Sequence, residues 1–158
     1  MKNSPIKRTK PLARTGGLSR AVRKRRPVRD TGPSRAVRAA VWKRAGGACE
    51  SCGMNVEARP RSVQHRVARG MGGTASPAAN RLSNLVLLCG TATTPGSCHE
   101  ACERRDPGMH DRGFWLWSWE DPEATAITPA SEHGAGLTVW LTPDGKYAMT
   151  PPEGAEAA

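Results

Sequence analysis

The chain has 158 residues, a formal net charge of +10 and only 4% aromatic residues, and it contains 17 Gly and 13 Pro. This length suits one domain with a small core, and small cores usually need a covalent or metal staple. The chain has no apolar run of about 18 residues that would predict a transmembrane helix. The basic N-terminus also lacks the apolar stretch of a secretion signal. Five cysteines without such a signal indicate a reducing compartment and metal ligation, so we expect a cytoplasmic protein with no membrane partner.

The positive charge is concentrated at the N-terminus. Residues 1–45 carry 15 Lys and Arg against one acid, whereas the rest of the chain carries 9 Lys and Arg against 13 acids. A basic arm on a mildly acidic body is typical of proteins that bind nucleic acid, although a solubilising tail is the alternative. Residues 1–32 also combine Pro and Gly with almost nothing to bury, so we expect a flexible arm that orders only on DNA.

The residues that follow the arm predict a helix over 34–45. Ser34 can cap its N-terminus, and Gly46 with Gly47 can end it. Apolar residues recur at helical spacing within this segment. Its other face carries basic side chains that we expect to face phosphate: Arg35, Arg38, Lys43 and Arg44.

Four cysteines form two pairs that can hold a metal. Cys49 and Cys52 lie in a turn that Gly53 allows to be tight, and Cys89 and Cys98 supply the second pair around a small, turn-rich insert at 90–97. Zn²⁺ prefers four tetrahedral sulfur or nitrogen ligands, and structural sites often take paired ligands from two turns. We therefore predict a structural zinc site. Cys102 is a spare that can compete as the fourth ligand or, as the pattern favours, pack as a thiol.

Short elements are predicted around these pairs. Residues 61–67 alternate as a short strand, 70–80 predict a loop, and 99–105 predict a helix that ends before Pro107. Residues 82–88 form the most apolar run, and we expect them to be buried beside the zinc as a strand or a short helical turn. The alternation of Trp115, Trp117 and Trp119 with smaller residues has a strand period, and we expect these rings to form core and cover rather than a base-stacking surface. Residues 137–141 and 146–150 flank a turn and predict a hairpin.

Five segments of the chain combine into one pattern: Cys49-x2-Cys52, His65-Arg66, Gly72-Gly73-Thr74, Asn84–Cys89 and Cys98-His99. This combined pattern resembles an HNH endonuclease. More narrowly, it is similar to the small HNH proteins of bacteriophages, especially those of actinobacteria, over roughly residues 34–112.

The resemblance implies an α+β fold with a zinc-stapled ββα-metal domain, also called a His-Me finger. It would have a basic flexible arm at 1–32, the nuclease domain at 33–112, a small β extension at 113–150 and a disordered tail at 151–158. The implied partner is DNA in a bacterial host cell. Phage proteins of this type often act beside the terminase during genome packaging, so a large terminase subunit or portal is an expected partner.

Hydrolysis of a phosphodiester requires an activated water and compensation of charge at the phosphate. A neutral imidazole is a suitable base near pH 7, and one divalent ion can polarise the phosphate and hold the leaving oxygen. By resemblance, His65 is the general base, Asn84 orients it by hydrogen bonding its loop, and His99 ligates the catalytic metal. The expected products carry 5′-phosphate and 3′-hydroxyl ends.

Gln64 departs from the family pattern. The family usually has Asp or His before the general base as the second metal ligand, and an amide oxygen is a weaker ligand. Mg²⁺ or Mn²⁺ fits such a site better than tightly bound zinc. Glu103, one helical turn after His99, can supply a carboxylate or simply lie on a solvated helix face.

Two further arginines, Arg66 and Arg69, follow the expected base closely in the sequence. We predict that they contact phosphate, with plain solvation as the alternative. A zinc-stapled module that binds nucleic acid without cleaving it is the alternative to the endonuclease, and Gln64 favours it. A structural zinc protein of the ribosomal type would explain the charge but not the spacing of His65, Asn84 and His99.

Overall fold

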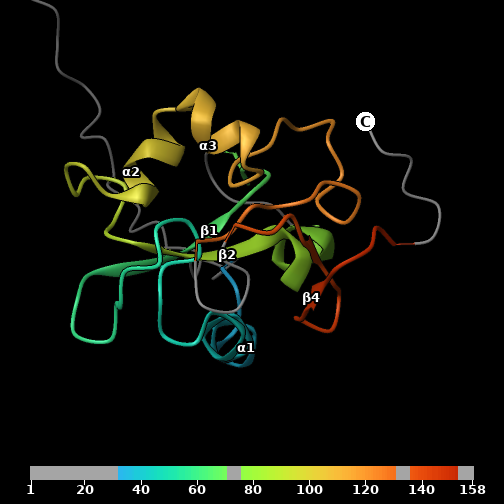
Figure 1. The fold of residues 1–158 in the computed structure, drawn as a ribbon, viewed down its shortest axis with the longest axis horizontal. Helices are drawn as coiled ribbons and strands as arrows, with labels where there is room; N and C mark the ends of the chain where they lie inside the picture. Colours follow the sequence, from blue (N-terminus) through green and yellow to red (C-terminus); the bar gives the residue numbers. More distant parts are fainter. Residues whose placement is uncertain (1–31, 71–75, 131–135, 153–158) are drawn as a thin grey trace, which may run out of the picture.

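A computed structural model describes residues 32–70, 76–130 and 136–152 of the chain. Nearly all of the expected basic arm and most of the expected tail lie outside these residues. The described part is a small mixed α/β fold with two antiparallel two-stranded sheets (Figure 1). Its elements are α1 (Arg35–Ala45), β1 (Arg61–His65), β2 (Leu85–Cys89), α2 (Cys98–Glu103), α3 (Pro107–Asp111), β3 (Trp140–Leu141) and β4 (Tyr147–Ala148), with short 3-10 turns at Pro77–Asn80 and Leu82–Asn84. Within the described ranges, no helix is long and apolar enough to cross a membrane.

The predicted first helix is confirmed, together with both of its caps. The side chain of Ser34 accepts a hydrogen bond from the Val37 amide at 3.3 Å. Gly46 adopts the left-handed conformation at φ 60°, which glycine allows without a Cβ clash, and its amide bonds the Lys43 carbonyl. The helix therefore begins and ends at the residues that its local sequence favours.

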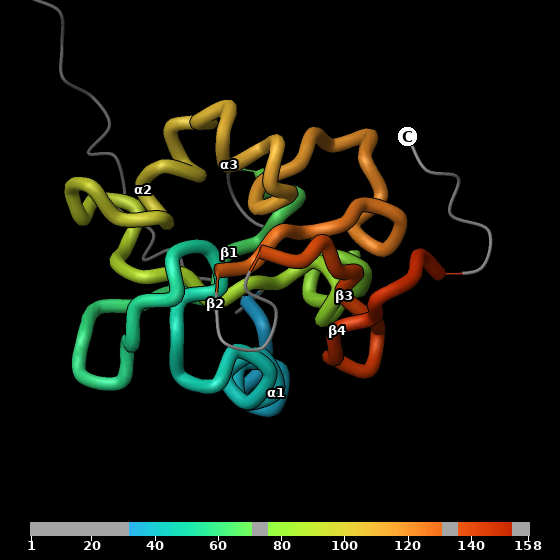
Figure 2. The backbone as a smooth tube through the Cα atoms, in the orientation of Figure 1, coloured from blue at the N-terminus to red at the C-terminus, as the bar shows by residue number. Residues whose placement is uncertain are grey.

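The pair β1–β2 forms the centre of the fold. The strands are antiparallel, with Arg61 opposite Cys89 and His65 opposite Leu85. In Figures 1 and 2, α1 lies on one side of this pair, and α2 and α3 lie on the other. Every residue of β2 is buried because elements cover both of its faces, which explains the uninterrupted apolar run in the sequence.

The strand predicted at the tryptophans is not present. Residues 113–119 form turns, and a single bridge joins Leu116 to Val67. Trp115 is buried, but Trp117 and Trp119 are 38% and 75% exposed, so the expectation that all three cover the core is wrong for two of them. Alternation alone does not make a strand here, because only Leu116 of this segment bridges to another segment, at Val67, which lies outside the strands.

The hairpin near the C-terminus is confirmed in a shorter form, as β3 and β4. A further helix, α3, begins at Pro107, where the preceding helix was expected to stop. Asp106 caps it by accepting a hydrogen bond from the Met109 amide at 3.2 Å, and proline is favourable in the first turn. Buried residues after position 113 belong to the same hydrophobic core as α1 and β2: Phe114, Trp115, Ile127, Val139 and Leu141.

A buried ion pair ties α1 to the cysteine turn, and it corrects the prediction that Arg44 faces phosphate. The Arg44 Nε donates to Glu50 Oε1 at 2.9 Å, and both side chains are almost completely buried. The same carboxylate accepts the Tyr147 hydroxyl and the Leu87 amide, each at 2.6 Å. A buried carboxylate requires such partners because its desolvation is costly. Arg44 therefore acts inside the fold, where it joins α1, β2 and β4.

Candidate functional site

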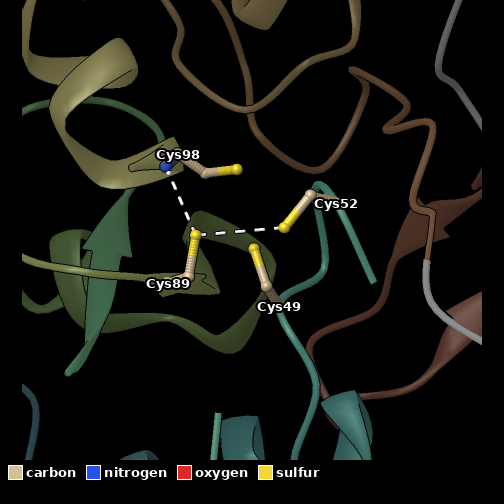
Figure 3. Close-up of side chains that lie close together, drawn as sticks. All are labelled: Cys49, Cys52, Cys89 and Cys98. Atoms are coloured by element: carbon tan, nitrogen blue, oxygen red, sulfur yellow. Dashed lines mark hydrogen bonds between the residues drawn. The ribbon is translucent and has the colours of Figure 1, made fainter. Parts of the chain in front are cut away.

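Four cysteines converge on one point and can hold a metal ion (Figure 3). The sulfur atoms of Cys49, Cys52, Cys89 and Cys98 all lie within 4.8 Å of one another. Cys89 ends β2 and Cys98 begins α2, while the first pair lies in the turn between α1 and β1. Tetrahedral Zn–S bonds of about 2.3 Å place sulfurs about 3.8 Å apart, and the Cys52 and Cys89 sulfurs are 3.9 Å apart. The predicted quartet is thus assembled by the fold.

A glycine and a backbone amide stabilise the conformation of the chain around the quartet. Gly53 has φ 74°, and a Cβ there would lie 2.6 Å from the Ala130 carbonyl oxygen, so only glycine fits. The Cys98 amide donates to the Cys89 sulfur at 3.4 Å. The hydrogen bond with the Cys98 thiol and burial raise the pKa of Cys49, and burial raises the pKa of Cys89. Thiolates this close need a cation to be stable together.

Cys102 is a packed thiol, as the sequence pattern favours. It is 3% exposed, and its sulfur lies 3.8 Å from the Phe114 carbonyl oxygen rather than in the quartet. Burial raises the pKa of this thiol to about 12. It therefore stays protonated and belongs to the core.

Three polar side chains meet across β1 and α2. Glu103 Oε1 lies 3.5 Å from His99 Nε2 and accepts a hydrogen bond from Gln64 Nε2 at 3.2 Å. The other ring nitrogen of His99, Nδ1, is buried without a hydrogen-bond partner among the described residues. Burial lowers the pKa of His99, against the Glu103 carboxylate, which raises it. We call Gln64, His99 and Glu103 the polar cluster.

The resemblance assigns metal binding to His99 and Gln64, and Glu103 joins them in space. The cluster offers a neutral imidazole and a carboxylate, and the Gln64 amide, which now presents its nitrogen to Glu103, would turn its oxygen inward to complete a donor set for a divalent ion such as Mn²⁺ or Mg²⁺. The cluster also adjoins the cysteine quartet, because His99 follows Cys98 directly in α2. A metal in the quartet would thus fix the start of the helix that carries His99.

His65 ends β1 and is 7% exposed. Its Nε2 lies 3.0 Å from Asn80 Oδ1, and the Asn80 amide nitrogen lies 3.4 Å from the Gly32 carbonyl oxygen. This orientation of the amide makes Nε2 the donor and leaves the lone pair on Nδ1. Burial, and then the nearby Arg69 charge, lower the pKa of His65 against the Asn80 contact, so the ring is neutral near pH 7. The residue that touches the ring is Asn80, which the sequence placed only in a loop.

Asn84 holds the loop after His65 rather than the ring itself. Its Oδ1 accepts the Val67 amide at 2.8 Å, and its Nδ2 donates to the Ala79 carbonyl at 2.9 Å. The two asparagines act together, since Asn84 fixes the backbone on which Asn80 stands. Asn84 therefore bonds the loop of His65, as the resemblance implies.

The structure corrects the prediction for Arg66. This side chain is 1% exposed and cannot contact phosphate. Its guanidinium donates to the main-chain carbonyls of Ser83, Gly113, Pro122, Thr125 and Ala126. Arg66 follows the expected base directly, so its position in the sequence indicated a DNA contact, but its charge is used to join distant loops.

The other predicted basic residues lie on separate surfaces. Arg35 and Arg38 are exposed and, with Arg61 and Trp42, line an open groove of about 890 Å³ between α1 and β1. Lys43 is exposed on another side of α1, near β4. Arg69 lies beside the 3-10 turn that carries Asn80. The groove and Arg69 thus offer positive charge in two places.

Comparison with known proteins adds no relative: no protein-family model matches the chain, and no curated protein or solved structure is detectably similar to it.

Proposed function

We propose that this chain is a divalent-metal-dependent DNA endonuclease of the HNH type. The observation that carries the proposal is the meeting of Gln64, His99 and Glu103 beside a buried, neutral His65. A small pocket of about 70 Å³ is lined by His65 and by Gln64 and Glu103 of the polar cluster. The exposed Arg35 and Arg38 on the groove beside β1 support a polyanionic substrate.

His65 is the proposed general base. With Nε2 donating to Asn80, the Nδ1 lone pair is free to take a proton from an attacking water. His99, Glu103 and the Gln64 amide would hold the divalent ion. That ion supplies charge neutralisation at the phosphate when bound. Cleavage by such a site leaves 5′-phosphate and 3′-hydroxyl ends.

We also propose that the cysteine quartet binds structural zinc. Zinc takes four ligands in structural sites, and the quartet supplies four sulfurs, so no coordination position would stay open for water or substrate. A closed sulfur site of this kind is structural rather than catalytic. Zinc would then join the cysteine turn, the end of β2 and the start of α2. This link would hold α2 in its position beside β1.

Replacement of the general base tests the proposal directly. We expect His65→Ala to lower the rate of nicking of supercoiled plasmid by about 10²–10⁴-fold, assayed over Mg²⁺, Mn²⁺ and Ni²⁺. His133→Ala is the control, because this histidine lies outside the motif. Zinc content and thermal unfolding must match between the variants. Undiminished cleavage by folded His65→Ala protein would refute the assignment.

A second candidate, the binding module without cleavage, is favoured by the Gln64–Glu103 hydrogen bond. The amide satisfies the carboxylate without any metal.

We expect Gln64→Asp to replace this bond with a pair of carboxylates that a divalent ion must bridge. The half-saturating Mn²⁺ concentration for cleavage should therefore fall about tenfold or more. Gln64→Ala is the matched control and should not show this gain. A wild-type protein that binds DNA but never cleaves it, together with an inactive Gln64→Asp variant, would favour the binding module.

A further inference from the structure

Three tryptophans and an arginine form a row that begins in the hydrophobic core and ends in solvent. We call Trp115, Trp117 and Trp119 the tryptophan ladder. The rings of Trp117 and Trp119 stack in parallel, with centroids 5.2 Å apart and planes at 3°. Trp115 meets Trp117 edge-on, with centroids 5.0 Å apart. The Arg105 guanidinium lies over both inner rings, 5.3 Å from Trp115 and 4.8 Å from Trp117.

The ladder runs from the core into solvent. Trp115 is 7% exposed, Trp117 38% and Trp119 75%. The Trp117 amide donates to Glu120 Oε2 at 2.6 Å, which fixes the backbone of the middle rung. An indole that is mostly exposed gains little from burial, so core packing does not explain Trp119. The outermost ring presents a flat aromatic surface to solvent.

Arg105 is held beside the ladder by an unusual backbone conformation. Its φ of 56° makes it the one non-glycine residue with positive φ in the described ranges. The conformation costs energy for a residue with a Cβ, and such strain is kept where surrounding contacts hold it. The Arg105 amide bonds the Cys102 carbonyl at 3.0 Å, just after α2. This strained turn, just after α2, thus places the Arg105 guanidinium over two indole rings.

The inner end of the ladder adjoins the candidate site. Arg105 and Trp115 line the same small pocket as Gln64, His65 and Glu103. A nucleic-acid strand whose phosphate lies at this pocket would have its neighbouring nucleotides within reach of the ladder. The outer rings therefore extend the proposed active site along one direction.

We propose that Trp119 stacks an unpaired base of the DNA substrate, so that the preferred substrate contains a single-stranded region such as a flap or a branch. The proposal rests on the proposed function. Every base has an aromatic face, so stacking of this kind tolerates any sequence. Arg105 lies over the two inner rings, where it holds the ladder that supports Trp119 in place. The Glu120 carboxylate, which accepts the Trp117 amide and lies 3.2 Å from His110 Nε2, counters the Arg105 charge, so an uncharged base suits the outer ring better than a phosphate.

Binding of labelled DNA to the full chain tests this. A fluorescein-labelled oligodeoxythymidine and a fully paired duplex of equal length are titrated with zinc-loaded protein, without added Mg²⁺ or Mn²⁺, and anisotropy is recorded. We expect Trp119→Ala to weaken binding of the single strand about tenfold while the duplex affinity stays within about twofold. The dependence of affinity on salt should not change, because no phosphate contact is lost. Trp119→Phe should retain most of the affinity, and Met149→Ala, another exposed apolar residue, should match wild type.

Two outcomes overturn the stacking proposal. One is equal single-strand affinity of Trp119→Ala and wild type. The other is sedimentation of wild type as a dimer that Trp119→Ala abolishes, which assigns the ladder to a second copy of the chain. The cleavage proposal is judged separately by plasmid nicking. A wild-type protein that binds through Trp119 but does not cut would keep the stacking assignment and remove the nuclease, and a cutting protein indifferent to Trp119→Ala would do the reverse.

Discussion

With zinc in the cysteine quartet, as proposed, removal of the metal by a strong chelator is expected to abolish the cooperative thermal unfolding of this protein. Structural zinc contributes on the order of 10–16 kcal/mol in small metal-bound domains, whereas a whole domain is stable by about 5–15 kcal/mol. The quartet joins three separate segments of the chain, so its loss releases the cysteine turn, the end of β2 and α2 at once. Circular dichroism during heating, before and after chelation, measures the effect.

Two cysteine variants separate metal ligation from packing. Cys49 and Cys102 are both buried, but only Cys49 belongs to the quartet. We expect Cys49→Ser to lose bound zinc and its melting transition, because a serine hydroxyl is a poor zinc ligand. Cys102→Ala should keep one zinc per chain and lose only about 1 kcal/mol of stability. A sharp melt in fully chelated wild type would contradict the structural role of the metal.

Features set by neighbouring residues were predictable from the sequence. The caps of α1 at Ser34 and Gly46 depend on side chains within a few positions, and they occur as expected. The pairing of Cys49 with Cys52 also reflects local turn geometry. The apolar run at 82–88, predicted as a buried strand or a short helical turn, contains both: a 3-10 turn at Leu82–Asn84 and the start of β2.

Features that depend on distant partners were not predictable. Asn80 reaches the His65 ring only because the loop that carries it folds back beside the end of β1, and no periodicity marks it. The helical pattern predicts that Arg44 lies on the surface, but its ion pair with Glu50 is buried in the core. The exposed end of the tryptophan ladder follows from the absence of a partner strand for residues 113–119, which alternation cannot reveal.

Arg66 is the clearest example of a residue whose role depends on distant partners, and its replacement is the second change for which we expect a large effect. In the sequence it adjoins the expected base, where a phosphate contact is the natural hypothesis. In the fold its guanidinium bonds five main-chain carbonyls from loops between residues 83 and 126. A guanidinium suits this position because it offers five N–H donors in one plane and remains charged.

Arg66→Ala is expected to destabilise the protein by about 5 kcal/mol, since five main-chain carbonyls, two of them in buried and three in partly buried hydrogen bonds, lose their donor. Each buried carbonyl left without a donor costs about 1–3 kcal/mol. This approaches the whole stability of a small domain, so the variant should be largely unfolded at 25 °C. Arg66→Lys should recover only part of the loss, because an ammonium has three donors and cannot reach all five acceptors. Urea unfolding followed by circular dichroism measures both.

The matched control is Arg81→Ala, in which an arginine with a 59% exposed side chain loses one surface ion pair to Glu123. We expect it to cost at most about 1 kcal/mol. The comparison also decides between the two roles of Arg66, because a phosphate contact would weaken DNA binding and leave the urea midpoint in place. An unchanged midpoint in Arg66→Ala would therefore return this residue to the DNA-facing surface. A urea midpoint that falls in the Arg66 variants but not in Arg81→Ala would show that Arg66, next to the proposed base, stabilises the loops whose carbonyls it bonds.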